Sequence, residues 1–384
     1  MVAIAPFDGL LYDPARVGDL AAVTSPPYDV VLPHDRDRLH ESSPHNIARV
    51  DLGADVPGEN QYTEAARLLR QWRDEGVLVA TGGPSVYPYE MWFAYQGAGR
   101  RVRGVILEVA MERWGRGVLP HERTMSAPVE DRLRLLRATR ADLSPIYAVV
   151  GGPSPAQADL LDRAAARTPN RELVDEEGTI HRLWAEPLSE DLIRWYRDQE
   201  LLVADGHHRY QTALTHRDEM RSREGPGPWD GVMMLVVDAA TEDPPVLPIH
   251  RLVRGPIPVL DGERVRSLEE VLLRLTDDDL RFGAAFREDG GLVHLVGRVD
   301  GEPPTVAALH RALLDDLPGD LRFVPDAALA EAAVRAGEAD VALFLPPARV
   351  AHVRAVVARG GRLPQKSTYF WPKPRTGLVI RPLK

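Results

Sequence analysis

The segment around Asp205 joins an apolar run to a helix through a single glycine. Residues 201–204 are typical of a short strand, and a helical pattern begins after Gly206 and continues to about Met220. The first backbone amides of a helix have no acceptor within it, so a strand that turns through glycine into a helix can bind an anion. Gly206 would let a phosphate approach the backbone, and the Arg209 guanidinium can hold two phosphate oxygens at once. We place Asp205 at the N-cap and predict a phosphate or nucleotide site formed by Asp205, Gly206, His207, His208 and Arg209.

Two adjacent histidines open this helix and raise the alternative of a transition-metal site. Neighbouring residues on a helix point about 100° apart, whereas a metal-binding histidine pair is usually spaced three or four residues apart. We therefore expect His207 and His208 to position the substrate or to assist acid–base catalysis. A transition-metal site is the minor alternative. Mg²⁺ held mostly by substrate phosphates fits the phosphate site, with Glu122 or Asp205 as a further ligand.

A second cluster of reactive side chains, His121-Glu122-Arg123-Thr124, precedes a predicted helix. A kinase needs a carboxylate to orient the attacking hydroxyl or to accept its proton. Glu122 is our candidate for that catalytic base, and Arg132, about two turns later, can support the loop through an ion pair. The alternative is that Glu122 and Arg123 form a solvated pair at the start of a helix.

The lysines are confined to one end of the chain. All three, Lys366, Lys373 and Lys384, lie in the last 24 residues, and arginine is used everywhere else. An ammonium group is compact and rotatable, so these positions can be ones where the planar guanidinium does not serve. We expect Lys366 to neutralise charge during catalysis, with Ser367 and Thr368 beside it as phosphate ligands, although this segment lacks the glycines of a P-loop. Chance clustering in a short tail is the alternative.

The order of apolar patterns predicts mixed α/β layers. The elements that position the site are expected to be a helix over 61–72, paired strands over 85–93 and 101–108, a helix over about 128–139 and a buried strand over 146–150. We expect four segments: an N-terminal α/β segment over 1–84, a phosphate-binding core over 85–254, an insert domain over 255–347 and a C-terminal segment over 348–384. The last segment is too aromatic and apolar for a disordered tail, so we expect it to return to the active site.

Composition excludes several classes of protein. The chain has no cysteine, which removes disulfides, thiolate metal sites and cysteine nucleophiles. Its formal net charge of −10 speaks against binding nucleic acid, because affinity for a phosphate backbone comes largely from basic side chains. No apolar stretch approaches the roughly 20 residues of a membrane span, and the N-terminus matches no signal peptide. We therefore expect a cytoplasmic protein, monomeric or homodimeric, that acts on a small molecule.

Taken together, the motifs resemble a family of bacterial and archaeal proteins known as domain of unknown function 1015 (DUF1015). The resemblance covers essentially the whole chain and runs through Ser25-Pro26-Pro27-Tyr28-Asp29-Val30, Pro44-His45-Asn46, His121-Glu122-Arg123-Thr124, Asp131-Arg132, Ala204-Asp205-Gly206-His207-His208-Arg209-Tyr210, His250-Arg251 and Pro364-Gln365-Lys366-Ser367-Thr368-Tyr369-Phe370. It implies that the polar residues of these motifs support the site or contact substrate, namely Tyr28, Asp29, Asn46, His121, Arg123, Thr124, Arg132, His250 and Arg251.

A shorter segment, Gly206 to Ala213, is similar to the Gly-x-x-Arg-x-x-Ala phosphate-binding box of the ParB and sulfiredoxin superfamily, with the alanine one position later. This resemblance implies a ParB/sulfiredoxin-like core and a nucleotide, ATP or ADP, at the helix N-terminus. The superfamily includes free-serine kinases, which carry a similar Asp-Gly-His-x-Arg element and a catalytic glutamate earlier in the chain. Glu122 would take the role of that glutamate, and serine or a related metabolite would be the substrate.

Three functions remain in competition. The first is a kinase that transfers a phosphoryl group from ATP or ADP to a metabolite hydroxyl with Mg²⁺. The second is a nucleotide-binding switch or slow nucleotide hydrolase of the ParB type. The third is a phosphatase or other hydrolase that uses the histidines.

Overall fold

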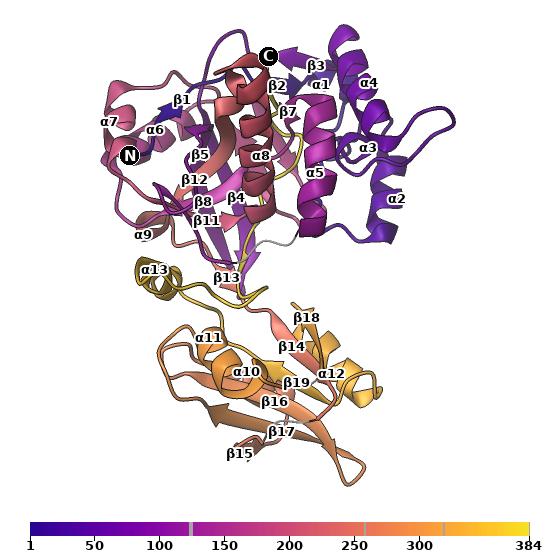
Figure 1. Cartoon of the computed structure of the whole chain (residues 1–384), viewed down its shortest axis with the longest axis vertical. Coiled ribbons are helices and arrows are strands. Elements are labelled where there is room, and N and C mark those ends of the chain that lie inside the picture. The colour runs from indigo at the N-terminus through magenta and orange to yellow at the C-terminus, as the bar shows by residue number, and fades with distance from the viewer. Residues whose placement is uncertain (123–125, 257–258, 318, 384) are drawn as a thin grey trace. The chain divides into compact units, whose positions relative to one another are not determined.

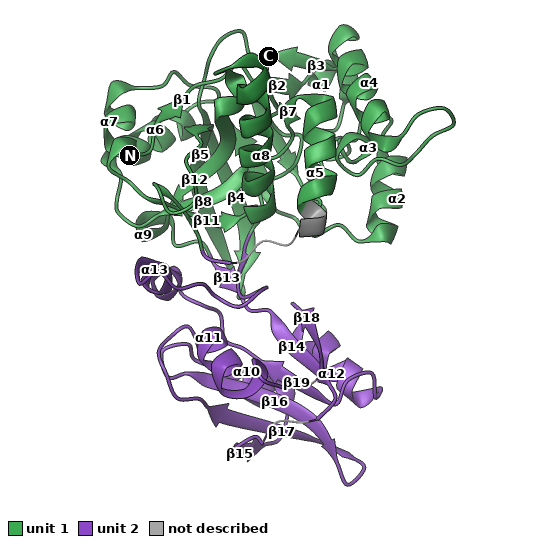
Figure 2. Ribbon diagram, viewed as in Figure 1, with its two compact units in different colours: residues 1–120, 124–244, 372–384 green, residues 121–123, 245–371 purple. Residues whose placement is uncertain are grey.

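The computed structural model describes residues 1–122, 126–256, 259–317 and 319–383. The chain forms two compact units (Figure 2): unit 1 comprises Met1–Pro120, Thr124–Pro244 and Pro372–Lys384, and unit 2 comprises His121–Arg123 and Pro245–Trp371. This division differs from the four segments expected from the sequence. The first 84 residues belong to unit 1, where Ile4 and Ala5 pair with Val109 and Glu108, and the expected C-terminal segment is shared between the units.

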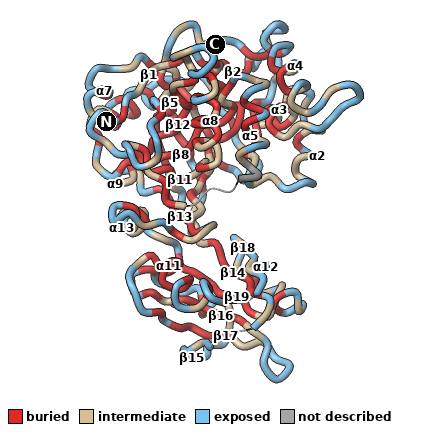
Figure 3. The backbone as a smooth tube through the Cα atoms, viewed as in Figure 1, coloured by how far each residue is buried: buried red, intermediate tan, exposed pale blue. Residues whose placement is uncertain are grey.

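Unit 1 is built on a mixed sheet, which confirms the predicted α/β class. Among the described residues it has nine strands, in the order β6 (Val118–Pro120), β11 (Leu201–Asp205), β8 (Ile146–Val150), β12 (Gly231–Asp238), β5 (Ala98–Ala110), β4 (Tyr87–Tyr95), β10 (Ile180–Leu183) and β9 (Arg171–Val174), with β1 (Ile4–Ala5) beside β5. β11 pairs with β6 in parallel and with β8 antiparallel. The central strands β8 and β12 are buried along their whole length, as expected for strands covered on both faces (Figure 3).

Helices cover the sheet of unit 1. The most important for the site are α8 (His207–Glu224) and α5 (Ser126–Thr139), which pack side by side, and α4 (Gln61–Asp74), which packs on α5 (Figure 1). α4 confirms the helix predicted over 61–72, and it buries one apolar face formed by Ala65, Ala66, Leu69 and Trp72. The remaining helices of the unit are short: α1 (Pro14–Val17), α2 (Pro33–Ser42), α3 (Ala48–Asp51), α6 (Pro155–Ala165), α7 (Glu190–Arg197) and α9 (Ala239–Glu242). None of the helices in the described part of the chain is both long and apolar enough to cross a bilayer.

Unit 2 has its own antiparallel sheet. Its strand order is β15 (Gly262–Val265), β17 (Gly291–Arg298), β16 (Arg281–Glu288), β19 (Val341–Phe344), β14 (His250–Arg254) and β18 (Asp320–Val324). Alternate residues of these strands point to opposite faces, so Leu343 and Phe344 belong to different apolar clusters. One cluster includes α11 (Thr305–Leu309) and the other α12 (Ala327–Arg335). The unit also contains α10 (Leu268–Arg274), α13 (Val350–Ala358) and the paired short strands β13 (Val246–Leu247) and β20 (Tyr369–Phe370).

The C-terminal strand β21 (Arg381–Pro382) is anchored in unit 1, where it pairs with β7 (Ala141–Asp142). Arg381 is 1% exposed, and its guanidinium donates to Glu108 at 2.6 and 3.0 Å and to Asp142 at 3.0 Å. It also donates to two backbone carbonyls. A planar donor with several hydrogens can satisfy all these acceptors at once, which a lysine could not do.

Replacing Arg381 with methionine should therefore destabilise unit 1 by about 3–5 kcal/mol, because Glu108 and Asp142 would keep their charges in a largely buried site without the cation. Hydrogen exchange of the unit 1 amides, followed by mass spectrometry, measures this loss. Arg16→Met, at an exposed position of α1, is the matched control. Equal protection in the two variants would contradict the anchoring role.

Candidate functional site

The predicted strand, glycine and helix are present. β11 ends at Asp205, Gly206 follows with φ of +92°, and α8 begins at His207. The positive φ favours glycine at position 206, and a Cβ atom there would lie 2.9 Å from Nε of Arg209 and would displace that guanidinium. The first helical hydrogen bond runs from the Tyr210 amide to the Gly206 carbonyl, and the preceding amides point out of the helix N-terminus.

Asp205 does not cap α8, in contrast to the sequence prediction. The N-cap is Gly206, and the Asp205 side chain instead binds two cations. Its Oδ2 accepts from Nη2 of Arg209 at 2.6 Å, and its Oδ1 pairs with Nζ of Lys373. Burial would raise the pKa of the Asp205 carboxyl, but the charges of Lys373 and Arg209 hold it well below its usual value. The carboxylate is therefore ionised at any physiological pH.

Lys373 is the lysine at this site. Lys366, which the sequence predicts to neutralise charge during catalysis, belongs to unit 2, whereas Lys373 belongs to unit 1 with Asp205. The confinement of lysine to the C-terminal residues was the sequence signal that pointed to a lysine at this site. This signal did not distinguish Lys366 from Lys373. The distinction depends on where unit 2 ends, at Trp371, and unit 1 resumes.

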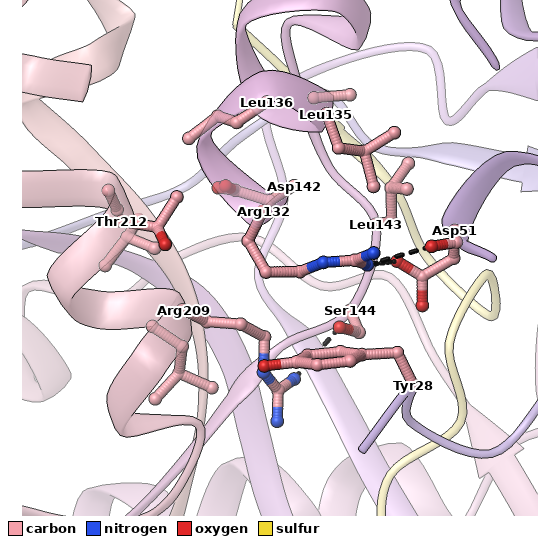
Figure 4. A pocket seen from close by; sticks show the side chains of 14 residues that line it. Tyr28, Asp51, Arg132, Leu135, Leu136, Asp142, Leu143, Ser144, Arg209 and Thr212 are labelled. Atoms are coloured by element: carbon pink, nitrogen blue, oxygen red, sulfur yellow. Dashed lines mark hydrogen bonds and ion pairs between the residues drawn. The ribbon is translucent and has the colours of Figure 1, made fainter. Parts of the chain in front are cut away.

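Arg209 joins this ion cluster to a cavity. Its Nη1 donates to Oγ of Ser144 at 2.9 Å and to the Pro145 carbonyl at 2.7 Å, so the side chain lies along the cavity wall (Figure 4). The cavity offers about 60 Å³ to water-sized molecules, room for a small metabolite rather than for a nucleotide. Tyr28, Arg132 and Arg209, three residues from separate predicted motifs, all line it.

Arg132 closes the opposite side of the cavity. Its guanidinium lies 4.4 Å from the centre of the Tyr28 ring and donates to Oδ1 of Asp51 at 2.8 Å (Figure 4). It also binds Asp131, the neighbouring residue of its motif, at 2.6 Å. Burial raises the pKa of the Tyr28 hydroxyl well above its usual value, so this phenol is a neutral hydrogen-bonding group.

Asp51 was not identified from the sequence. It lies in α3 among residues without an obvious motif, yet it is only 5% exposed, and burial raises the pKa of its carboxyl despite the nearby Arg132 and Arg209. Its Oδ2 atom and Nε of Arg209 are both buried and have no hydrogen-bond partner among the described residues. One acceptor and one donor are therefore unsatisfied in residues that line the same cavity.

The remaining predicted residues of unit 1 have mainly supporting positions. The Asn46 side chain is fully buried and binds the carbonyls of Ala22 and Thr24, which holds the segment before Tyr28. Asp29 is exposed. The His207 ring is 8% exposed and stacks on Trp114, with 6.1 Å between ring centres, while His208 is partly exposed.

Unit 2 brings the other predicted cluster together. Oε1 of Glu122 accepts from the Ser367 amide at 2.9 Å, and Nε2 of His121 lies 2.6 Å from Oγ1 of Thr368. Lys366 precedes this pair with φ of +54°. The predicted residues Arg123 and Thr124 lie outside the described residues. Two distant motifs, around residues 122 and 367, thus form one site within unit 2.

His250 and Arg251 are buried in unit 2. Arg251 is fully buried and donates to Nε2 of His310 at 3.0 Å and to the Gln365 carbonyl at 3.3 Å, so it holds the loop that carries Lys366. Burial, together with the charge of Arg251, lowers the pKa of His250 to about 4. Nδ1 of neutral His250 accepts from the Leu345 amide at 3.2 Å.

Within the part of the chain that the structure describes, no three His, Asp or Glu side chains are grouped closely enough to hold a metal ion. Asp205, one of the two residues predicted as a Mg²⁺ ligand, has both carboxylate oxygens bound to the cations Arg209 and Lys373.

The sequence matches the family described as a protein of unknown function, DUF1015, over residues 4–303. The chain belongs to the DUF1015 family. The matched range contains the motifs around Tyr28, Glu122, Asp205 and Arg251, while those around Lys366 and Lys373 lie beyond it. The site of this DUF1015 protein therefore combines residues from inside and outside the matched range.

Solved structures with some likeness to this DUF1015 protein have low sequence identity to it. A free serine kinase in complex with AMP has 15% identity and a TM-score of 0.38, over 72% of this chain and 92% of that one. A conserved hypothetical protein from Pyrococcus furiosus has 14% identity and a TM-score of 0.34, over 71% and 93%. SbnI with a C-terminal truncation, from Staphylococcus aureus, has 12% identity and a TM-score of 0.33, over 67% of this chain and 81% of that one. No curated protein matches the sequence. These identities are too low to transfer the role of any residue.

Gly206→Ala should disorganise the ion cluster without unfolding unit 1. The added methyl would strain the left-handed backbone at a cost of about 1–2 kcal/mol and would displace the Arg209 guanidinium. A crystal structure of the variant should show Arg209 turned away from Asp205. Gly18→Ala, at a positive φ with nothing within 4 Å of the added atom, is the control for backbone strain alone. An unmoved Arg209 would contradict the argument.

Unit 2 should lose stability on acidification. The folded pKa of His250 is about 4 and the unfolded value is about 6.5, so the unfolded state binds more protons between these values. Stability should fall as pH decreases from about 6.5 towards 4, by up to about 3 kcal/mol for this group. Hydrogen exchange of the unit 2 amides at about pH 7 and pH 5 measures the slope.

His250→Asn, which keeps an acceptor for the Leu345 amide, should reduce this slope. His34→Gln, at a side chain that is 76% exposed, should leave it unchanged. The same slope in His250→Asn and in the wild type would rule out His250 as its source.

Proposed function

We propose that this protein is a nucleotide-dependent kinase that transfers a phosphoryl group from ATP or ADP to the hydroxyl of a small metabolite, with free serine as the first candidate. The observation that carries the proposal is the pair of cations, Lys373 and Arg209, fixed by Asp205 at the N-terminus of α8. Outward-pointing amides and two ordered cations are what a transferring phosphate group needs.

Asp205 has a defined part in this proposal. It holds both cations in place, but its own negative charge would repel a phosphate. Asp205 would be one ligand of a Mg²⁺ ion carried mainly by the substrate phosphates, and that ion would supply positive charge against the repulsion. Arg209 and Lys373 would then share their hydrogen bonds between Asp205 and the phosphate oxygens.

The cavity beside Arg209 is the proposed acceptor site. Its unsatisfied groups are the buried acceptor Oδ2 of Asp51 and the buried donor Nε of Arg209. An amino acid offers an ammonium group for the first and a carboxylate for the second, which is the basis for preferring serine to a simple alcohol. A ligand that satisfies both atoms recovers the cost of leaving them buried.

The reaction needs one proton acceptor. The serine oxygen would form a bond to the terminal phosphorus while the bond from phosphorus to the bridging oxygen of the nucleotide breaks, and the hydroxyl proton would pass to a carboxylate. Glu122 stays our proposed base.

The two other functions have less support. A phosphatase would need a histidine that can attack phosphorus, and of the two in the motif His207 is buried against Trp114 and His208 is partly exposed. A nucleotide switch without an acceptor would leave the charged cavity without a role. The direct experiment is to incubate the full chain with ATP or ADP, Mg²⁺ and L-serine and to detect phosphoserine by ³¹P NMR.

We expect phosphoserine with at least one of the nucleotides. Lys373→Met should weaken nucleotide binding, measured by calorimetry, by about tenfold or more, since one charge-assisted contact of about 1.5–3 kcal/mol is lost. Arg16→Met is the charge-matched control. Glu122→Gln should bind nucleotide normally and lose turnover. Nucleotide binding without formation of phosphoserine would rule out serine as the acceptor. The absence of nucleotide binding would rule out the kinase function.

A further inference from the structure

A second cavity lies in unit 1, between α4, the C-terminal end of α5 and the C-terminal strand β21. It offers about 250 Å³ to water-sized molecules and shares only Ala141 with the cavity beside Arg209. None of the residues proposed for phosphoryl transfer lines it. Any ligand bound there would occupy a separate site.

The floor of this cavity is apolar. Leu10, Leu69 and Ile380 line it, and each is at most 6% exposed. They come from a strand, a helix and the C-terminal segment, and the Leu10 amide donates to the Ile380 carbonyl at 2.8 Å, which fixes two of the three together. These three side chains expose little apolar area to water, so an apolar group packed against them would add a modest gain in free energy to binding.

The rim of the cavity is positively charged. Arg70 and Arg73 lie one turn apart on α4, and Arg140 reaches the rim from the end of α5. Elsewhere on α4, Arg67 binds Glu64 at 2.6 Å, but neither the Arg70 nor the Arg73 guanidinium forms a hydrogen bond or ion pair with any described residue. Arg140 lies 3.5 Å from Glu224. No acidic side chain lines the cavity within the described residues.

We propose that this cavity binds a small anion with an apolar body, such as a medium-chain or aryl carboxylate or phosphate ester. The Arg70 and Arg73 guanidinium groups would hold the anionic head in bidentate fashion, and the body would cover the floor around Leu69. Inorganic phosphate would leave the floor exposed, and a neutral molecule would leave the arginines unused. The inference is independent of the proposed kinase activity.

The test is calorimetry on the full chain with octanoate as the probe, and with 1-octanol and inorganic phosphate as the apolar and anionic parts alone. We expect octanoate to bind more tightly than either part. The double variant Arg70→Gln/Arg73→Gln should bind octanoate about tenfold more weakly, or weaker still. Arg113→Gln/Arg116→Gln removes the same charge at two exposed positions of unit 1 and should bind as the wild type does.

A second variant tests the apolar half of the site. Ala138→Leu narrows the cavity without changing its charge. It should therefore weaken the binding of octanoate while Arg70 and Arg73 stay available to bind an anion. Equal binding by the wild type and Arg70→Gln/Arg73→Gln, phosphate binding as tight as that of octanoate, or no octanoate binding would each overturn the proposal. Binding to phosphatidylglycerol vesicles without binding of free octanoate would also overturn it, because the surface would then recognise a bilayer.

Discussion

The ion cluster of Lys373, Asp205 and Arg209 is the interaction on which the unit 1 site depends. A carboxylate at the end of a buried strand would be costly alone, and it is stable here because two cations meet it. The cluster connects three parts of the chain: β11, the first turn of α8 and the C-terminal segment. Through Arg209 it also reaches Ser144 and the cavity, so the ion cluster and the cavity share one side chain.

Local patterns in the sequence predicted the elements well. The strand, glycine and helix around Gly206 were predictable because glycine, an apolar run and helical periodicity act over a few residues. The apolar face of α4 and the hairpin of β4 and β5 followed for the same reason. That Tyr28, Arg132 and Arg209 line one cavity could be predicted only from their membership in motifs. No local pattern relates residues so far apart in the sequence.

What the sequence did not predict depends on long-range packing. Asp51 has no motif around it, and its importance comes from burial and from the unsatisfied oxygen. Lys366 and Lys373 lie seven residues apart in similar surroundings, yet they belong to different units. The N-cap of α8 was assigned to Asp205 from propensity, but the tertiary ion pairs compete for that carboxylate and leave the cap to Gly206.

The return of the last residues to unit 1 has a consequence for synthesis. Residues 245–371 of unit 2 are contiguous and form their own sheet, so this unit can fold as soon as they have left the ribosome. Unit 1 must wait, because β21 and Lys373 are made after everything else in it. A ribosome that stalls before Lys373 would release a chain with one finished unit and no ion cluster. The ion cluster thus forms only on chains that have been translated past Lys373, and shorter products would lack it.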